Sequence, residues 1–229
     1  STPIKSSAAS DVYKRQDLDG TLLYTLKGLS NACNMALEKM GLPPIKTNSY
    51  KYLVGCGADK LMEGMLRTVK HKAEEEDIAK LKEYFNQSYS ENLFYKTKPY
   101  YGIDRMLDNL KKQGLKLGVF SNKPDEYTQL LISALLPDRF DAVRGKKEDT
   151  PRKPDPAGAL YIAKELGAEP ADCLYIGDSG VDMQTAKNAG MLPMGVLWGF
   201  RERKELLSQG ARFLAERPED IITLIKVIG

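Results

Sequence analysis

Short apolar runs alternate with longer amphipathic stretches from residue 115 to the end of the chain. The runs at 115–120, 173–176 and 194–198 are short, mostly apolar and end near turn residues, as buried parallel strands do. The stretches at 103–113, 126–135, 157–166, 183–189, 202–208 and 219–226 show the spacing of helices, several followed by glycine. This alternation predicts an α/β core, a parallel sheet covered by helices.

Residues 26–95 have a different pattern, with helical periodicity and few strand-like runs. Apolar stripes at 29–40, 61–66 and 78–89 recur at helical spacing, and Gly41 ends the first. Methionines and aromatic residues in such stripes are more often core than binding residues. We expect an all-helical cap at 26–95, inserted into a core made of residues 17–25 and 96–229.

Residues 1–16 contain few sizeable apolar side chains, and serines and basic residues separate them. This composition predicts a tail that is disordered or foreign to the native protein.

Composition narrows the class of protein. A chain of 229 residues with 42% hydrophobic content can bury a full core. Its 34 basic and 31 acidic residues are interspersed, which argues against a nucleic-acid partner. No run approaches the roughly 18 apolar residues of a membrane span, and no signal-like stretch opens the sequence. We therefore expect a cytoplasmic enzyme, monomeric or homodimeric.

Cysteine and histidine carry no pattern that indicates catalysis or metal binding. Cys33, Cys56 and Cys173 stand in apolar or glycine-rich surroundings, which predicts buried, reduced thiols. His71 lies between lysines in a polar stretch and is expected to be solvated.

The first chemical motif is Asp17-Leu18-Asp19-Gly20-Thr21. If the backbone turns between the two acids, one can attack phosphorus while the other reaches the leaving oxygen. Gly20 permits a tight loop whose amides can hold phosphate oxygens. Calcium loops and plain turns use the same residues, so the motif alone does not decide.

Two further motifs follow predicted strands or precede helices. Ser121-Asn122 follows the run at 115–120, where α/β sheets place ligands, although serine there is also a common turn or cap residue. Lys153-Pro154-Asp155-Pro156 fixes a cation that suits a phosphoryl group, although most lysines lie on the surface.

The last motif is Gly177-Asp178-Ser179-Gly180-Val181-Asp182, directly after the run at 173–176. Acids four residues apart at a strand-to-helix junction suit oxygen coordination of Mg²⁺ or, alternatively, the capping of a helix. All the motifs fall where the chain leaves the sheet, in an order that favours one shared site.

These motifs resemble the haloacid dehalogenase superfamily, whose ordered signature is DxDGT, a strand-end Ser or Thr, a lysine and GDxxxD. The resemblance covers residues 17–229, and it implies a Rossmann-like core. The strings at 121–124, 153–156 and 196–201, the helical insertion and the loop at 55–57 are similar to the phosphoglycolate phosphatase-like branch.

The resemblance implies a Mg²⁺-dependent phosphatase acting on a small phosphate monoester. It makes Asp17 the nucleophile that forms an aspartyl-phosphate and Asp19 the general acid and base. Phosphate-binding groups and metal ligands are implied at these positions: Gly20, Thr21, Ser121, Asn122 and Lys153 for phosphate, and Asp17, Asp19 through its main-chain carbonyl, Asp178 and Asp182 for the ion.

The sequence departs from the family pattern in two places. Lys14, Arg15 and Gln16 stand where an apolar first strand normally precedes the nucleophile, which suggests that this strand is lost or replaced. Tyr24 stands where the branch commonly has an acid, which bears on the cap and on substrate choice.

Other functions share this set of residues. A sugar-phosphate mutase, a pyrophosphatase and a phosphonate hydrolase are enzymes of the same plan. A receiver-like phospho-switch and a catalytically impaired phosphate-binding protein are the alternatives without turnover.

Overall fold

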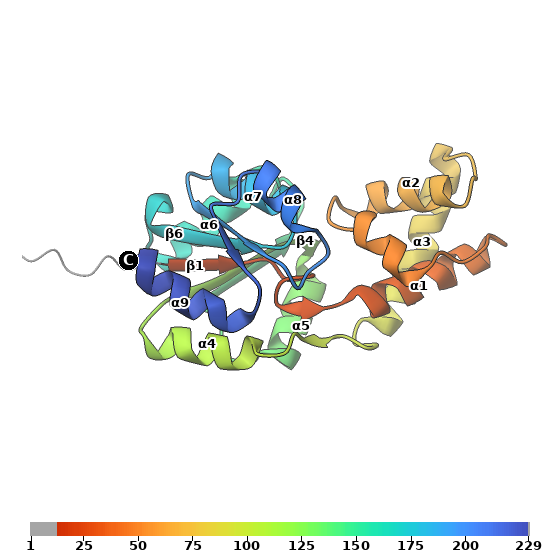
Figure 1. Cartoon of the computed structure of the whole chain (residues 1–229). Coiled ribbons are helices and arrows are strands. Elements are labelled where there is room, and N and C mark those ends of the chain that lie inside the picture. The colour runs from red at the N-terminus through yellow and green to blue at the C-terminus, as the bar shows by residue number, and fades with distance from the viewer. Residues whose placement is uncertain (1–12, 229) are drawn as a thin grey trace, which may run out of the picture.

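A parallel six-stranded sheet forms the centre of the molecule (Figure 1). The computed structural model describes residues 13–228. The strands lie in the order β5-β4-β1-β6-β7-β8, and every neighbouring pair is parallel. Their bounds are β1 Tyr13–Gln16, β4 Leu117–Pro124, β5 Ala142–Lys146, β6 Cys173–Gly177, β7 Leu192–Val196 and β8 Phe213–Ala215. The predicted α/β fold is confirmed.

Helices cover both faces of this sheet, and alternate strand residues pack against each layer. On β6, Leu174 and Ile176 join the core that includes α4, α5 and α9, whereas Cys173 and Tyr175 pack with α6 and α7. Burial on both faces explains the continuous apolar run of this strand. The helices are α4 Ile103–Lys112, α5 Asp125–Leu135, α6 Ala157–Leu166, η2 Pro170–Asp172, α7 Gly180–Asn188, α8 Arg203–Ser208 and α9 Pro218–Ile228.

A helical segment stands beyond one end of the sheet (Figure 1). It consists of α1 Leu26–Lys39, η1 Thr47–Tyr52, α2 Ala58–Thr68 and α3 Glu75–Asn92. Two short antiparallel strands, β2 Leu23–Tyr24 and β3 Lys98–Pro99, pair where the chain enters and leaves it. The predicted helical stripes pack inward, with Leu37, Met62 and Leu81 fully buried.

Strand β1 lies at the centre of the sheet, where the sequence predicted a tail. Its main chain pairs on both sides, so that Lys14 lies opposite Leu117 of β4 and Leu174 of β6. The hydrogen bonds of this ladder join backbone groups and do not depend on the side chains. The polar sequence of β1 therefore gave no apolar pattern from which the strand could be predicted. Residues 13–16 therefore form a strand and not a disordered tail, and the rest of the predicted tail lies outside the described residues.

The cysteine prediction is confirmed in part. Cys33 and Cys173 are buried, but Cys56 is exposed because it lies in the glycine-flanked loop between η1 and α2, and none of the three forms a disulfide. His71 contacts Asp77 (Nε2 to Oδ2, 2.9 Å) within the helical segment. None of the helices in the described part of the chain has both the length and the apolar content that a bilayer crossing requires.

Candidate active site

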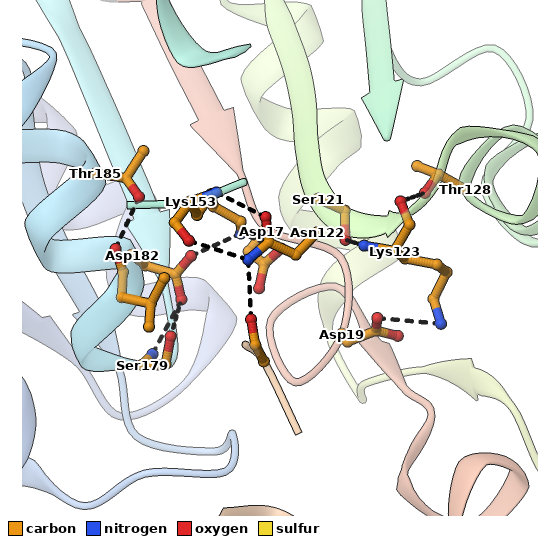
Figure 2. A network of polar contacts seen from close by, with 12 residues as sticks. Asp17, Asp19, Ser121, Asn122, Lys123, Thr128, Lys153, Ser179, Asp182 and Thr185 are labelled. Atoms are coloured by element: carbon orange, nitrogen blue, oxygen red, sulfur yellow. Dashed lines mark hydrogen bonds and ion pairs between the residues drawn. The ribbon is translucent and has the colours of Figure 1, made fainter. Parts of the chain in front are cut away.

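The sequence motifs converge at the carboxyl edge of the sheet. Asp17 directly follows β1, Ser121 lies on the neighbouring strand β4, and Asp178 directly follows β6 on the other side. Lys153 reaches the same place from the connection between β5 and α6. Figure 2 shows Asp17 between a group containing Lys153 and Asp182 and a group containing Asp19 and Lys123.

Three buried carboxylates form the centre of the site. Each of Asp17, Asp178 and Asp182 offers an oxygen, and these oxygens lie within 4.8 Å of one another. The Lys153 ammonium, itself buried, lies 2.6 Å from Asp17 Oδ1 and 2.8 Å from Asp182 Oδ1. A single ammonium thus contacts two of the three buried carboxylates.

This crowding changes the proton affinity of the acids. Burial raises the pKa of Asp17 to about 7, with the Lys153 ammonium opposing the rise and Asp182 adding to it. Burial, Asp182 and Asp17 together raise the pKa of Asp178 well above its usual range. A bound cation would offset the repulsion between these carboxylates, and carboxylate oxygens are ligands that suit Mg²⁺. The donor set therefore fits a divalent metal ion.

Neighbouring groups hold two of these acids in place. Ser179 donates its hydroxyl (2.6 Å) and its backbone N–H (3.1 Å) to Asp182 Oδ2, which caps helix α7. The backbone N–H of Phe200 donates to Asp178 Oδ2 (2.6 Å). The N-cap of α7 is thus Ser179 and not an aspartate, Asp182 is the first-turn acid of the capping box, and Asp178 and Asp182 both belong to the acidic cluster.

Gly20 is required by both its conformation and its surroundings. Its φ of +81° lies in the left-handed region, and a Cβ there would lie 2.2 Å from Asp178 Oδ2. A Cβ at Gly199 would lie 2.2 Å from the Cβ of the same aspartate. The turn after β1 and the loop after β7 therefore close around Asp178.

Asp19 points away from the acidic cluster, as a turn between the two acids of the motif predicts. Its Oδ2 lies 3.2 Å from Lys123 Nζ, and that ammonium also donates to the hydroxyl of Tyr89. Burial alone would lower the pKa of Lys123, but Asp19 and Tyr89 outweigh it and the pKa is raised. Asp19 Oδ1 is buried and makes no hydrogen bond within the described residues.

The predicted phosphate-binding residues have mixed placements. Ser121 Oγ accepts from the backbone N–H of Lys123 (3.2 Å). Asn122 accepts from the backbone N–H of Lys153 (2.8 Å) and donates to the carbonyl of Gly55 (2.9 Å), so it joins the core to the helical segment. The carbonyl of Thr21 accepts from the Trp198 indole (2.9 Å).

A cavity of about 120 Å³ opens over these residues. One wall carries Asp17, Asp19, Ser121 and Lys153. The opposite wall comes from the helical segment and is mostly apolar, and it includes Leu26, Leu29, Leu61, Phe85 and Tyr89. Gly20 and Thr21 are not among the described residues that line it.

Reasoning from the sequence missed Lys123 and Tyr89. Lys123 stands in the Ser-Asn-Lys-Pro string, which was the available signal, but a lone lysine usually lies on the surface. Tyr89 sits in an apolar stripe and is indeed buried, yet its hydroxyl faces a cation of the site.

Comparison with known proteins agrees with this geometry. The family model described as haloacid dehalogenase-like hydrolase matches residues 16–196. Phosphoglycolate phosphatases from Aquifex aeolicus and Mannheimia succiniciproducens are 34% and 31% identical, over 91% and 93% of this chain and 94% and 96% of theirs.

Solved structures share the fold. A candidate phosphoglycolate phosphatase from Lactobacillus delbrueckii subsp. bulgaricus superposes with a TM-score of 0.89 at 31% identity, over 93% of this chain and 97% of that one. A β-phosphoglucomutase from Clostridium difficile superposes with a TM-score of 0.74 at 22% identity, over 92% of each chain, and so shares the fold alone. The chain belongs to the haloacid dehalogenase-like hydrolase family.

Proposed function

We propose that this chain, a phosphatase by its family and by the names of its relatives, hydrolyses a small phosphate monoester resembling phosphoglycolate. The observation that supports this most strongly is the meeting of Asp17, Asp178, Asp182 and Lys153 at one buried point beside a small cavity.

The reaction has two halves. In the first, an Asp17 carboxylate oxygen bonds to phosphorus, the ester P–O bond breaks, and the Asp19 carboxyl gives its proton to the departing oxygen, which leaves as an alcohol. In the second, water attacks the aspartyl-phosphate and gives a proton back to Asp19. Inorganic phosphate leaves, and the Asp17 carboxylate is restored.

Asp17, Asp178 and the main-chain carbonyl of Asp19 are proposed to hold Mg²⁺, with Asp182 supporting the set through Lys153 and Ser179. When bound, the ion supplies positive charge that offsets the phosphate and nucleophile charges. The Lys153 ammonium is placed to neutralise the equatorial phosphate oxygens, and the Ser121 hydroxyl can donate to one of them.

The helical segment, residues 26–95, is proposed to be a cap that excludes water from the reaction. Core residues next to the catalytic ones contact it: Asn122 bonds Gly55, Arg152 pairs with Asp59 (3.6 Å), and Arg201 bonds the Val54 carbonyl (3.2 Å). We propose that the leaving group is small, because side chains of this segment form the cavity wall that lies across from Asp17 and Asp19.

A panel of esters tests this function. Purified protein is incubated with Mg²⁺ and 2-phosphoglycolate, glucose 1-phosphate, glucose 6-phosphate, pyrophosphate or phosphonoacetaldehyde, and released phosphate is measured before and after EDTA treatment. We expect Mg²⁺-dependent phosphate release that is fastest with 2-phosphoglycolate.

The other outcomes identify the alternatives. Interconversion of hexose phosphates without phosphate release would indicate a mutase. Fastest phosphate release from pyrophosphate would indicate a pyrophosphatase, and fastest release from phosphonoacetaldehyde a phosphonate hydrolase. Phosphorylation without turnover would indicate a phospho-switch, and no phosphorylation a binding protein.

A further inference from the structure

Lys123 is a buried cation that the proposed reaction does not yet use. Its side chain is only 4% exposed, at the end of β4, and its ammonium contacts two groups. One is the Asp19 carboxylate, in the turn after β1, and the other is the Tyr89 hydroxyl, on α3. Burying an ammonium costs free energy unless charged or hydrogen-bonding partners offset the loss of hydration. The role of Lys123 therefore follows from the roles of Asp19 and Tyr89.

The two oxygens of Asp19 have different environments. Oδ2 lies 3.2 Å from the Lys123 ammonium. Oδ1 is buried, makes no hydrogen bond within the described residues, and belongs to a side chain that lines the cavity. A charge-assisted contact to one oxygen restricts the rotation of the carboxylate and leaves the other oxygen for a different partner.

Tyr89 fixes the lysine in turn. Its ring stacks on Phe85 with centroids 5.1 Å apart and meets the edge of Tyr127 at 5.6 Å. The Lys123 ammonium lies 4.7 Å from the Tyr89 ring centroid in addition to donating to its hydroxyl. Because α3 belongs to the helical segment, this support is present only when the segment lies where the structure has it.

We propose that Lys123 is the positioning residue of Asp19, and that Tyr89 completes it from the helical segment. The proposal rests on the proposed function. The ammonium holds Oδ2 so that Oδ1 faces the reacting ester; Oδ1 gives its proton to the oxygen whose bond to phosphorus breaks, and later takes a proton from the attacking water. Lys123 itself neither bonds to phosphorus nor transfers a proton.

This role predicts that the effect of a substitution depends on the leaving group of the substrate. An alkoxide departs slowly unless it is protonated, whereas acetate departs readily without a proton. Damage to the positioning of Asp19 should therefore slow alkyl phosphates and spare acetyl phosphate. The ratio kcat/KM is the quantity to measure, because it reports the steps up to and including departure of the leaving group. Hydrolysis of the aspartyl-phosphate comes later and does not affect it.

The experiment compares Lys123→Met, Tyr89→Phe and Asp19→Asn with the parent protein. Lys147→Met is the matched control, since Lys147 is an exposed lysine paired with Asp125 (3.2 Å). The substrates are 2-phosphoglycolate, 2-hydroxyethyl phosphate, which lacks the carboxylate, and acetyl phosphate. For Lys123→Met we expect kcat/KM to fall about 100-fold with both esters and to stay within about threefold with acetyl phosphate. Tyr89→Phe should follow the same pattern at about tenfold, and Lys147→Met should match the parent.

Several results would overturn the inference. Equal losses with all three substrates would make Lys123 a general support of the fold or of phosphate binding. A loss confined to 2-phosphoglycolate, as a rise in KM, would make it a receptor for the substrate carboxylate. If Lys123→Met fails to unfold cooperatively on heating, the Tyr89→Phe pattern decides in the same way. A parent protein inactive on every substrate would refute the proposed function and the inference with it.

Discussion

At the scale of single residues, the site is a cluster of buried charges whose carboxylates outnumber the ammonium group that contacts them. Lys153 serves Asp17 and Asp182 at once, while Asp178 depends on a backbone amide and a close-fitting glycine turn. The acids remain buried together although the negative charge of Asp182 raises the pKa of both Asp17 and Asp178. Burying these carboxylates together is expected to lower the stability of the metal-free protein. Two measurable consequences follow.

Replacing Asp17, the proposed nucleophile, should end turnover. Asp17→Asn keeps the size of the side chain but removes the attacking carboxylate, so we expect phosphate release to fall at least about 1,000-fold, roughly 4 kcal/mol in barrier. Asp138→Asn, at an exposed residue, is the matched control. Retention of activity within about tenfold would exclude Asp17 as the nucleophile.

The same substitution should stabilise the metal-free protein in a pH-dependent way. Because the folded pKa of Asp17, about 7, exceeds the ordinary value of 3.8, the folded state binds more protons between these values. Its stability contribution is present below about pH 4 and is lost as the pH rises towards 7. In EDTA, the melting temperature of Asp17→Asn minus that of the parent should therefore grow from pH 4 to 7 and then level off. A constant difference would contradict the raised pKa.

At the scale of elements, the turn after β1 is expected to tolerate substitution poorly. Gly20→Ala would place a methyl group against the Asp178 carboxylate as well as strain the backbone. Gly41→Ala has a similar φ, +69° against +81°, with nothing within 4 Å. Gly41→Ala should lose about 1–2 kcal/mol of stability in chemical unfolding, and Gly20→Ala should lose more because of the clash with Asp178. Only Gly20→Ala should also lose phosphatase activity and bind Mg²⁺ weakly; equal activities would mean that Asp178 can move freely.

The sequence predicts those elements whose side chains are buried on a regular period. Helix α6 has the predicted bounds, because its buried side chains recur at helical spacing, and β6 differs by one residue, because it is a short continuous apolar run. Strands β1 and β5 were not predicted as strands, since Lys14, Arg15 and Gln16 in one and Arg144 and Lys146 in the other break the apolar pattern. Pairing of the main chain between neighbouring strands decides such cases, and it depends on residues far away in the sequence.

The site divides in a similar way. Asp17, Asp178, Asp182 and Lys153 could be placed together because each stands where the chain leaves a strand or enters a helix. The partner of Asp19 could not, because Lys123 and Tyr89 meet only after the helical segment has packed against the core.

At the scale of the whole molecule, Arg201 is one of several core residues that contact the helical segment. The Arg201 guanidinium donates to the carbonyls of Lys51 and Val54 across the boundary and pairs with Glu205 on its own side (3.3 Å). Its neighbour Phe200 contacts Asp178 through the backbone. The boundary and the acidic cluster are thus joined by adjacent residues.

Removing this arginine should loosen the boundary and spare the chemistry. Arg201→Ala is expected to raise KM about tenfold or more, because hydrogen bonds from a charged donor are lost, with a smaller change in kcat. Hydrogen exchange at residues 51–54 should become faster. Arg203→Ala, which removes an exposed pair with Glu216, is the control. Unchanged KM and exchange would show that the boundary does not depend on Arg201.

The order of strands in the sheet has a consequence for how the protein is made. Strand β1 is flanked by β4 and β6, which begin at Leu117 and Cys173, so its neighbours are synthesised long after it. Closing such long loops is slow, and unpaired strands expose their edges meanwhile. A nascent chain that has not yet passed Asp182 on the ribosome therefore carries Asp17, the proposed nucleophile, without the complete acidic cluster. Catalytic competence should appear late in translation and all at once.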